Sequence, residues 1–187
     1  ESLLLKNAII SENSYIYNTS QDEPQCQGVG TTIGSLHFYD NKVSVAHVGA
    51  SRAYRIRAGS LQQVTNDHSL VQELIDRGFF THEEAMANTP KNLVIRALGI
   101  EANVEVDVAE EQVQTGDISL LCSDGLNDRI SDEEIHSTLS KYGANVADGA
   151  DELIRLANQN GAKTISRWCW HVHAIPSRRV VAGFQSC

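Results

Sequence analysis

The stretch VGTTIGSLHFYDNKVSVAHVG, Val29–Gly49, alternates apolar and polar side chains on both sides of Tyr39-Asp40-Asn41-Lys42. Alternation with a period of two is typical of β-strands with one buried face, and Asp and Asn tolerate the backbone of a tight turn. The stretch AYRIRAGSLQQVT, residues 53–65, repeats the pattern around Ala58-Gly59. The sequence therefore predicts antiparallel strands joined by short hairpin turns.

Helical spacing appears on both sides of these strands. Apolar residues recur every three or four positions near the start and predict an amphipathic helix from residue 2 to about residue 18, buried through Leu3, Leu4, Ala8, Ile9, Tyr15 and Ile16. Further helices are predicted over 70–78, 81–88, 131–139 and 146–160, and strand chemistry returns over 104–125. Because strands and helices come in blocks, the chain is predicted to be α+β with antiparallel sheets.

Two helix starts carry capping boxes, in which a hydroxyl residue is followed three places later by glutamate. These are Thr81 with Glu84, and Ser131 with Glu134. Asp67 is predicted to cap the helix that begins at Leu70. The alternative is that Asp67 and His68 form an oriented acid and base.

Composition limits the class of protein. The 187 residues are 41% apolar, which is ordinary for a soluble domain. Residues up to Lys163 contain 12 basic and all 24 acidic residues, a charge of −12, so nucleic acid and anionic membranes are not expected as partners. No apolar run approaches the roughly 20 residues that span a bilayer. Four scattered cysteines favour a reducing cytoplasm over a disulfide scaffold.

The most specific local motif is LLCSDGLND, residues 120–128, in which an apolar strand runs into Ser123-Asp124-Gly125. A carboxylate at a strand end, beside a glycine, suits a hard cation such as Mg²⁺ or Mn²⁺. The alternative is an ordinary Asp-Gly turn. A second motif, HVGASRAY over 47–54, places Ser51 and Arg52 after a strand, where the arginine is either a phosphate clamp or an exposed residue beside a bulge.

The order of these motifs resembles bacterial members of the metal-dependent protein phosphatase family, the type 2C serine/threonine phosphatases. The resemblance runs from about Gly28 to Lys163 through GVGTT, VAHVGASRAYRIRAGSLQQVTNDHSLVQELIDRG, NLVIRALG and GDISLLCSDGLND followed by SDEEI. It implies a β-sandwich of two antiparallel sheets flanked by helices. It also implies hydrolysis of phosphoserine and phosphothreonine esters by water activated by two or three Mn²⁺ or Mg²⁺ ions.

The resemblance further implies roles for particular residues. Asp124 corresponds to a metal-binding aspartate of the family, and the segment from Asp67 to Gly99 corresponds to a flap beside the active site. Residues near this site are expected to be Ser51, Arg52, Asp67, His68, Ser123 and Gly125. The implied partners are a phosphoprotein substrate and a paired serine/threonine kinase, in the cytoplasm.

Three departures from the family pattern bear on activity. The family's early Asp-Gly-Met-Gly-Gly motif does not occur in this sequence, Ala50 stands where bacterial relatives have a metal-binding aspartate, and Thr164 follows Lys163 where relatives continue with Asp-Asn. We therefore expect residues 1–163 to be a partial phosphatase domain, incomplete at both ends and inactive by itself. The alternative is an inactive phosphatase-like module that binds a phosphoprotein or regulatory partner.

Composition changes abruptly after Lys163, where no acidic residue follows and three Arg, both Trp and two Cys occur. Inserting one base before the codon of Thr164 permits the reading Asp-Asn-Ile-Thr-Val-Val-Leu-Ala. The codons of Trp168 to His171 then encode Val-Leu-Ala for every codon choice. We therefore interpret residues 164–187 as an out-of-frame tail, and expect this tail to lack regular structure.

Overall fold

The computed structural model describes residues 1–90, 93–161, 169–172 and 179–186, the last two ranges as backbone only. The helices are α1 (Ser2–Asp22), α2 (Leu70–Asp76), α3 (His82–Asn88), α4 (Asp124–Asn127), α5 (Asp132–Tyr142) and α6 (Val146–Gln159), with a 3₁₀ turn at Pro24–Cys26. The strands are β1 (Thr31–Tyr39), β2 (Lys42–Val48), β3 (Arg52–Arg57), β4 (Ser60–Gln63), β5 (Asp107–Gln112), β6 (Ile118–Cys122), β7 (Cys169–Val172) and β8 (Arg179–Ser186).

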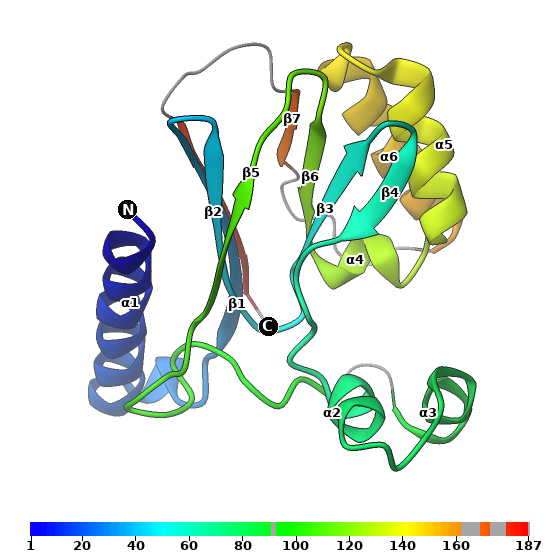
Figure 1. Cartoon of the computed structure of the whole chain (residues 1–187). Coiled ribbons are helices and arrows are strands. Elements are labelled where there is room, and N and C mark those ends of the chain that lie inside the picture. The colour runs from blue at the N-terminus through cyan, green and yellow to red at the C-terminus, as the bar shows by residue number, and fades with distance from the viewer. Residues whose placement is uncertain (91–92, 162–168, 173–178, 187) are drawn as a thin grey trace.

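Two antiparallel sheets pack face to face, as predicted. Sheet 1 has the strand order β5-β2-β1-β8 and sheet 2 has the order β4-β3-β6-β7. Helix α1 covers the outer face of sheet 1, α5 and α6 cover sheet 2, and α2 and α3 protrude from one end (Figure 1). The chain is therefore an α+β sandwich in four layers, which confirms the predicted fold class.

Each layer boundary has its own apolar cluster. Between the sheets lie Leu36, Phe38, Val43, Val45, Ala53 and Leu121. Sheet 1 packs on α1 through Ile9, Ile33, Ala46, Val48, Leu98 and Val106. Sheet 2 packs on α4, α5 and α6 through Tyr54, Ile56, Leu120, Leu126, Ile135, Leu139 and Leu153, among others. Alternate residues of one strand thus serve different clusters, as the period of two requires.

The hairpin that links β1 and β2 forms as predicted. Tyr39 pairs with Lys42 in the register. Asp40 and Asn41 have φ values of 44° and 59°. Positive φ at both central residues is the geometry of a type I′ turn, whose twist matches that of the strands.

The helix starts agree with the sequence in two cases and differ in one. Both capping boxes are present, at Thr81 with Glu84 and at Ser131 with Glu134. The predicted cap at Asp67 is wrong, because the Ser69 side chain accepts the amide of Gln72 at the start of α2. Asp67 cannot also serve there, since its carboxylate binds Arg52.

Helix α1 forms over the predicted range and extends to Asp22, but its buried stripe differs from the prediction. Leu3 and Leu4 are 69% and 68% exposed, whereas Ile9 and Asn13 are buried. Asn13 donates to the carbonyls of Glu101 and Ala102 and accepts the amide of Gly99. Helix α1 therefore turns the polar Asn13 inward, where its side chain satisfies backbone groups of residues 99–102.

The tail contributes strands, which contradicts the expectation that it lacks regular structure. Strand β7 pairs with β6, and strand β8 pairs with β1 over eight register positions from Thr31↔Ser186 to Phe38↔Arg179. Strand pairing uses backbone groups that every residue except proline supplies, so an open sheet edge accepts many sequences. Thr164, where the sequence departs from the Asp-Asn of the family pattern, lies outside the described residues.

Acid sensitivity is predicted for the ion pair between Arg57 and Asp117. The Asp117 side chain is 4% exposed and its Oδ2 lies 2.7 Å from Arg57 Nη2. Burial alone would raise the pKa of Asp117, but hydrogen bonds from Arg57 and from the Gln114 amide outweigh burial and hold it below its ordinary value. Since the folded pKa lies below the unfolded one, this stabilisation is present at neutral pH and is lost as the pH falls through the folded value.

We expect Asp117→Asn to lower the free energy of unfolding at pH 7 by about 2 kcal/mol, the usual worth of a charged hydrogen bond. The difference from the unmodified chain should shrink as the pH falls from 5 toward 2, measured by urea unfolding. Asp22→Asn, at the exposed end of α1, is the control. A difference that stays constant with pH would contradict the assignment.

Candidate functional site

Four chain segments meet at the end of the sandwich from which α2 and α3 protrude. Strand β2 ends there at Val48, β3 begins at Arg52, β6 ends at Cys122, and the 65–69 segment passes beside them. Arg52 pairs with Cys122 in the antiparallel register of β3 and β6. Ala50 and Ser51 therefore precede β3, and Ser123 and Asp124 follow β6, at the same end of this strand pair.

Asp124 is the first residue of α4 and follows directly from β6. Asp124 and Gly125 are half-buried, and Ser123, at the N-cap position, is buried. The segment is a strand-to-helix junction, so the simple Asp-Gly turn is not what forms. Such a junction holds a carboxylate at the mouth of the sandwich, where a cation could approach it.

The 49–52 loop is packed tightly against β1. Ser51 Oγ lies 2.9 Å from Thr32 Oγ1. Gly49 has φ of 101°, and a Cβ there would lie 2.3 Å from Thr32 Cγ2. A side chain at position 49 would therefore require Thr32 or the 49–52 loop to shift.

Arg52 binds the 65–69 segment. Its Nε donates to Asp67 Oδ1 at 2.9 Å and its Nη2 donates to Asp67 Oδ2 at 2.7 Å, a bidentate pair. Its Nη1 donates to the Tyr54 hydroxyl, which donates to Asp132 Oδ1. Burial raises the pKa of Tyr54. With three guanidinium nitrogens engaged by protein groups, Arg52 ties strands to loops instead of presenting an open phosphate clamp.

His68 lies on the other side of the same loop. Its backbone amide donates to the Gly49 carbonyl at 3.0 Å, and its Nδ1 accepts the Gly49 amide at 3.1 Å. Its ring stacks on the ring of His47, with centroids 4.6 Å apart. Its Nε2 faces Asp107 Oδ2 at 3.2 Å. Burial lowers the pKa of His68 and favours its neutral form.

His47, His68 and Asp107 could in principle hold a metal ion. One ligand atom of each lies within 4.8 Å of the others. His47 Nε2 donates to the Asn66 carbonyl at 2.7 Å, which leaves His47 Nδ1 to face a ligand. This is the arrangement that metal-binding histidines usually adopt.

Two contacts weigh against a metal at this cluster. Because His68 Nδ1 accepts the Gly49 amide, the neutral ring carries its proton on Nε2, the atom that would have to bind the metal. The Arg96 guanidinium also lies 2.8 Å from Asp107 Oδ1 and 3.1 Å from His68 Nε2. A cation already occupies this place, so the cluster fits an arginine better than a metal.

The family resemblance implies a two-metal site that includes Asp124, and such a site needs several carboxylate ligands. Ala50 supplies no ligand, and Asp67 is bound by Arg52. Neither of these two positions therefore adds a second carboxylate to that of Asp124. That set does not fit a two-metal centre by itself.

Sequence analysis singled out Asp67, His68 and Arg52, and the structure brings these three together around the 49–52 loop. It missed the roles of His47, Arg96 and Asp107. Asp107 occupies a polar position in the alternating 104–112 stretch, and Arg96 lies in NLVIRALG. Nothing local in the sequence links them, because their contacts cross 11 and 28 positions.

Known proteins resemble this chain in sequence. The serine/threonine protein phosphatase PstP of Mycobacterium tuberculosis is 40% identical over 158 residues, which cover 84% of this chain and 30% of PstP. The serine/threonine phosphatase stp of Listeria welshimeri is 38% identical over 159 residues, 85% of this chain and 63% of that protein. The chain therefore spans less than two thirds of these relatives. No protein-family model matches the chain.

Solved structures of the same group of phosphatases resemble this chain in fold. The catalytic domain of PstP, solved in complex with 2 manganese ions, superposes with a TM-score of 0.75 at 35% identity, covering 97% of this chain and 70% of that one. In this chain, the carboxylate-bearing residue Asp124 directly follows strand β6.

Proposed function

Because the chain belongs to the metal-dependent protein phosphatase family, whose bacterial members include PstP and stp, we propose that it forms part of a serine/threonine phosphatase catalytic domain. The observation that carries the proposal is the position of Asp124. Asp124 begins α4 directly after β6, whose last residue, Cys122, pairs with Arg52 at the start of β3.

We propose that Asp124 is a metal ligand, with Mn²⁺ or Mg²⁺ as the ion. Either ion, when bound in a pair, lowers the pKa of water and neutralises charge on phosphoryl oxygens. Ala50 and the Arg52-bound Asp67 do not supply the further ligands that a two-metal centre needs. Asp124 directly follows β6, and bonds from Asp67 to Arg52 and from His68 to Gly49 hold the 49–52 loop at the adjoining start of β3.

The proposed substrates are phosphoproteins carrying phosphoserine or phosphothreonine, produced by a partner serine/threonine kinase, in the cytoplasm. None of the helices in the described part of the chain is long and apolar enough to cross a membrane. The charge of −9 argues against nucleic acid as a partner.

Paramagnetic Mn²⁺ provides the test, because it broadens nuclear magnetic resonance signals of nearby amides. In the 187-residue chain, low concentrations of Mn²⁺ are expected to broaden the signals of Ser51 and Gly125 before others. Asp124→Asn should abolish this selectivity. Ala50→Asp, which adds a carboxylate where the family resemblance implies a metal ligand, should tighten Mn²⁺ binding about tenfold, since affinity rises with the number of charged ligands.

The same samples should show negligible hydrolysis of p-nitrophenyl phosphate, because one carboxylate cannot hold two ions. Mn²⁺-dependent turnover that Asp124→Ala removes would show that this chain carries a sufficient ligand set. Broadening that ignores Asp124→Asn would contradict the proposed ligand.

The second candidate function is a phosphatase-like module that binds a phosphoprotein or regulatory partner without catalysis. The loss of a carboxylate at Ala50 and the engagement of Asp67 by Arg52 favour it. Fluorescence anisotropy separates the two: a module binds a phosphopeptide equally well with and without Mn²⁺, whereas a phosphatase site binds it better with the metal.

We further propose that residues 1–163 and 164–187 have different origins, the second part being read out of frame. The codon regrouping that yields Asp-Asn-Ile-Thr supports this boundary. The source DNA is the test, since codons at 164–171 that cannot regroup in this way rule the proposal out.

A further inference from the structure

The two ends of the α2–α3 segment meet in a short neck. We call residues 69–90 and 93–95 the flap. Ser69 forms an antiparallel bridge with Val94, the Leu70 amide donates to the Leu93 carbonyl at 2.9 Å, and the Ile95 amide donates to the His68 carbonyl at 2.9 Å. The flap therefore leaves the sandwich at His68 and returns at Arg96.

A single carboxylate joins both sides of this neck. Asp107 Oδ1 accepts Arg96 Nη1 at 2.8 Å, and Asp107 Oδ2 lies 3.2 Å from His68 Nε2. Since His68 Nδ1 accepts the Gly49 amide, its Nε2 carries the proton and donates to Asp107. The carboxylate thus accepts one hydrogen bond from the residue before the flap and one from the residue after it.

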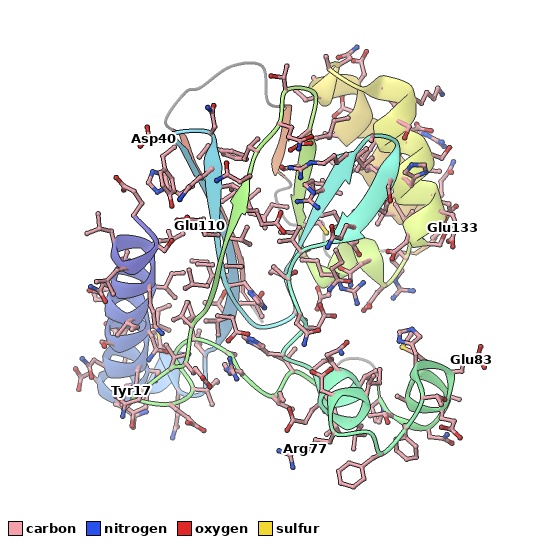
Figure 2. All side chains as sticks on the ribbon, viewed as in Figure 1. Tyr17, Asp40, Arg77, Glu83, Glu110 and Glu133 are labelled. Atoms are coloured by element: carbon pink, nitrogen blue, oxygen red, sulfur yellow. The ribbon has the colours of Figure 1, made fainter. Side chains whose placement is uncertain are left out.

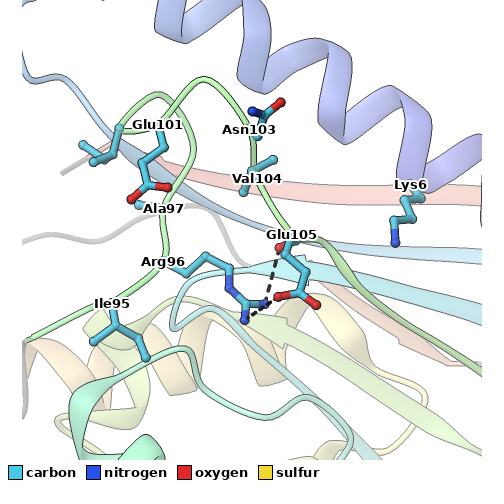
Figure 3. A pocket seen from close by; sticks show the side chains of 9 residues that line it. Lys6, Ile95, Arg96, Ala97, Glu101, Asn103, Val104 and Glu105 are labelled. Atoms are coloured by element: carbon cyan, nitrogen blue, oxygen red, sulfur yellow. Dashed lines mark hydrogen bonds and ion pairs between the residues drawn. The ribbon is translucent and has the colours of Figure 1, made fainter.

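The carboxylate is itself anchored in sheet 1. Asp107 begins β5 and pairs with His47 of β2 in the register. Arg96 also contacts Glu105, through the carboxylate at 3.2 Å and the backbone carbonyl at 3.4 Å (Figure 3). The neck is therefore fastened to β5, the edge strand of sheet 1, and not only across its own Ser69–Val94 bridge.

The first side of the neck is bonded to the 49–52 loop. Asp67 binds Arg52, and His68 binds Gly49 at both its amide and its ring. Ala50 and Ser51 lie between these two attachment points. A shift of the neck would therefore move the 49–52 loop through both attachment points.

We propose that His68, Asp107 and Arg96 form a clasp that closes the neck of the flap and sets its position relative to the 49–52 loop. The guanidinium of Arg96 is the cation beside His68 and Asp107, two of the residues that could hold a metal ion. These three are positioning residues. Their effect on a reaction rests on the proposed phosphatase function, but the clasp itself does not.

The expected effect is moderate because the clasp is partly open to water. The Arg96 and Asp107 side chains are 29% and 45% exposed, and Arg96 lines a surface groove together with Lys6, Ile95 and Glu101. Ion pairs at this exposure contribute less than buried ones. Amide hydrogen exchange suits the test because it reports local opening of the neck without requiring metal or turnover.

In the 187-residue chain, Arg96→Met is expected to speed exchange of the Leu70 and Ile95 amides about fivefold, as loss of an ion pair at partial exposure implies. Asp107→Asn should do the same, and the double variant should change exchange by less than the two single changes combined, because both remove the Arg96–Asp107 pair. Arg96→Lys should give a smaller effect, since it keeps the charge but loses the planar fork. Amides that bond β3 to β6 should exchange as before.

Arg77→Met is the matched control, because Arg77 forms an exposed ion pair with Glu73 within the flap but outside the neck. It should leave the Leu70 and Ile95 amides unchanged. Unchanged neck exchange in Arg96→Met, or a uniform increase throughout the chain, would overturn the clasp. So would Mn²⁺ binding that His68→Gln removes and Asp124→Asn does not. If Mn²⁺ binding persists in both His68→Gln and Asp124→Asn, the proposed metal ligand is contradicted. The hydrogen-exchange result then still decides whether the clasp exists.

Discussion

Replacing Arg52 with methionine is expected to lower the free energy of unfolding by about 3 kcal/mol, the range found when one partner of a buried ion pair is removed. The Asp67 side chain is 11% exposed and would keep its charge without its bidentate partner. The Tyr54 hydroxyl would also lose the donor at 3.0 Å. Urea unfolding followed by circular dichroism measures the change.

Arg77→Met controls for the loss of an arginine charge. Arg77 directly follows α2 (Figure 2) and its side chain is 65% exposed. Exposed helical pairs contribute about 0.3–0.5 kcal/mol. A companion variant, Arg52→Met with Asp67→Leu, should recover part of the loss, because it removes the stranded charge. Similar effects of Arg52→Met and Arg77→Met would refute the view that Arg52 ties β3 to the 65–69 segment.

Asn13→Ala is expected to lower the free energy of unfolding by about 2–3 kcal/mol. The Asn13 side chain is fully buried, accepts the Gly99 amide at 2.8 Å and donates to two backbone carbonyls. Truncation leaves these buried backbone groups without partners, and each such group costs about 1–3 kcal/mol. Thermal and urea unfolding both report the change.

Asn7→Ala is the matched control, since it makes the same replacement at an exposed position of α1. It should be neutral or stabilise the chain slightly, because alanine favours the helix by up to about 0.7 kcal/mol over asparagine. If Asn13→Ala were as harmless as Asn7→Ala, α1 would have to be held by its apolar stripe alone. Proteolysis in the 99–102 segment would then also be unchanged.

Local patterns predicted the elements of the fold well. The β1–β2 hairpin, both capping boxes and the helical ranges depend on residues within a few positions of one another, and the structure confirms them. The order of the motifs predicted the family and, with it, the sandwich. Ser123, Asp124 and Gly125 lie at the strand end where the pattern put them.

Local patterns failed where distant groups compete for the same atom. Asp67 has the chemistry of a helix cap, yet Arg52, 15 positions away, binds its carboxylate and Ser69 caps α2 instead. Leu3 and Leu4 have the chemistry of a buried stripe, yet α1 turns Asn13 inward to satisfy the backbone near Gly99. The tail pairs with β1 and β6 because edge strands bind through their backbones.

The sequence by itself determined the element types, the hairpin turn at Asp40-Asn41, the helix caps at Thr81 and Ser131, and the strand-end aspartate. These depend on backbone preferences and on side chains within one turn of each other. Only the tertiary structure decided that His68, Asp107 and Arg96 meet, and that Arg52 is bound by Asp67. Charged side chains select partners by distance in space, and the sandwich brings together residues whose separation along the chain carries no periodic signal.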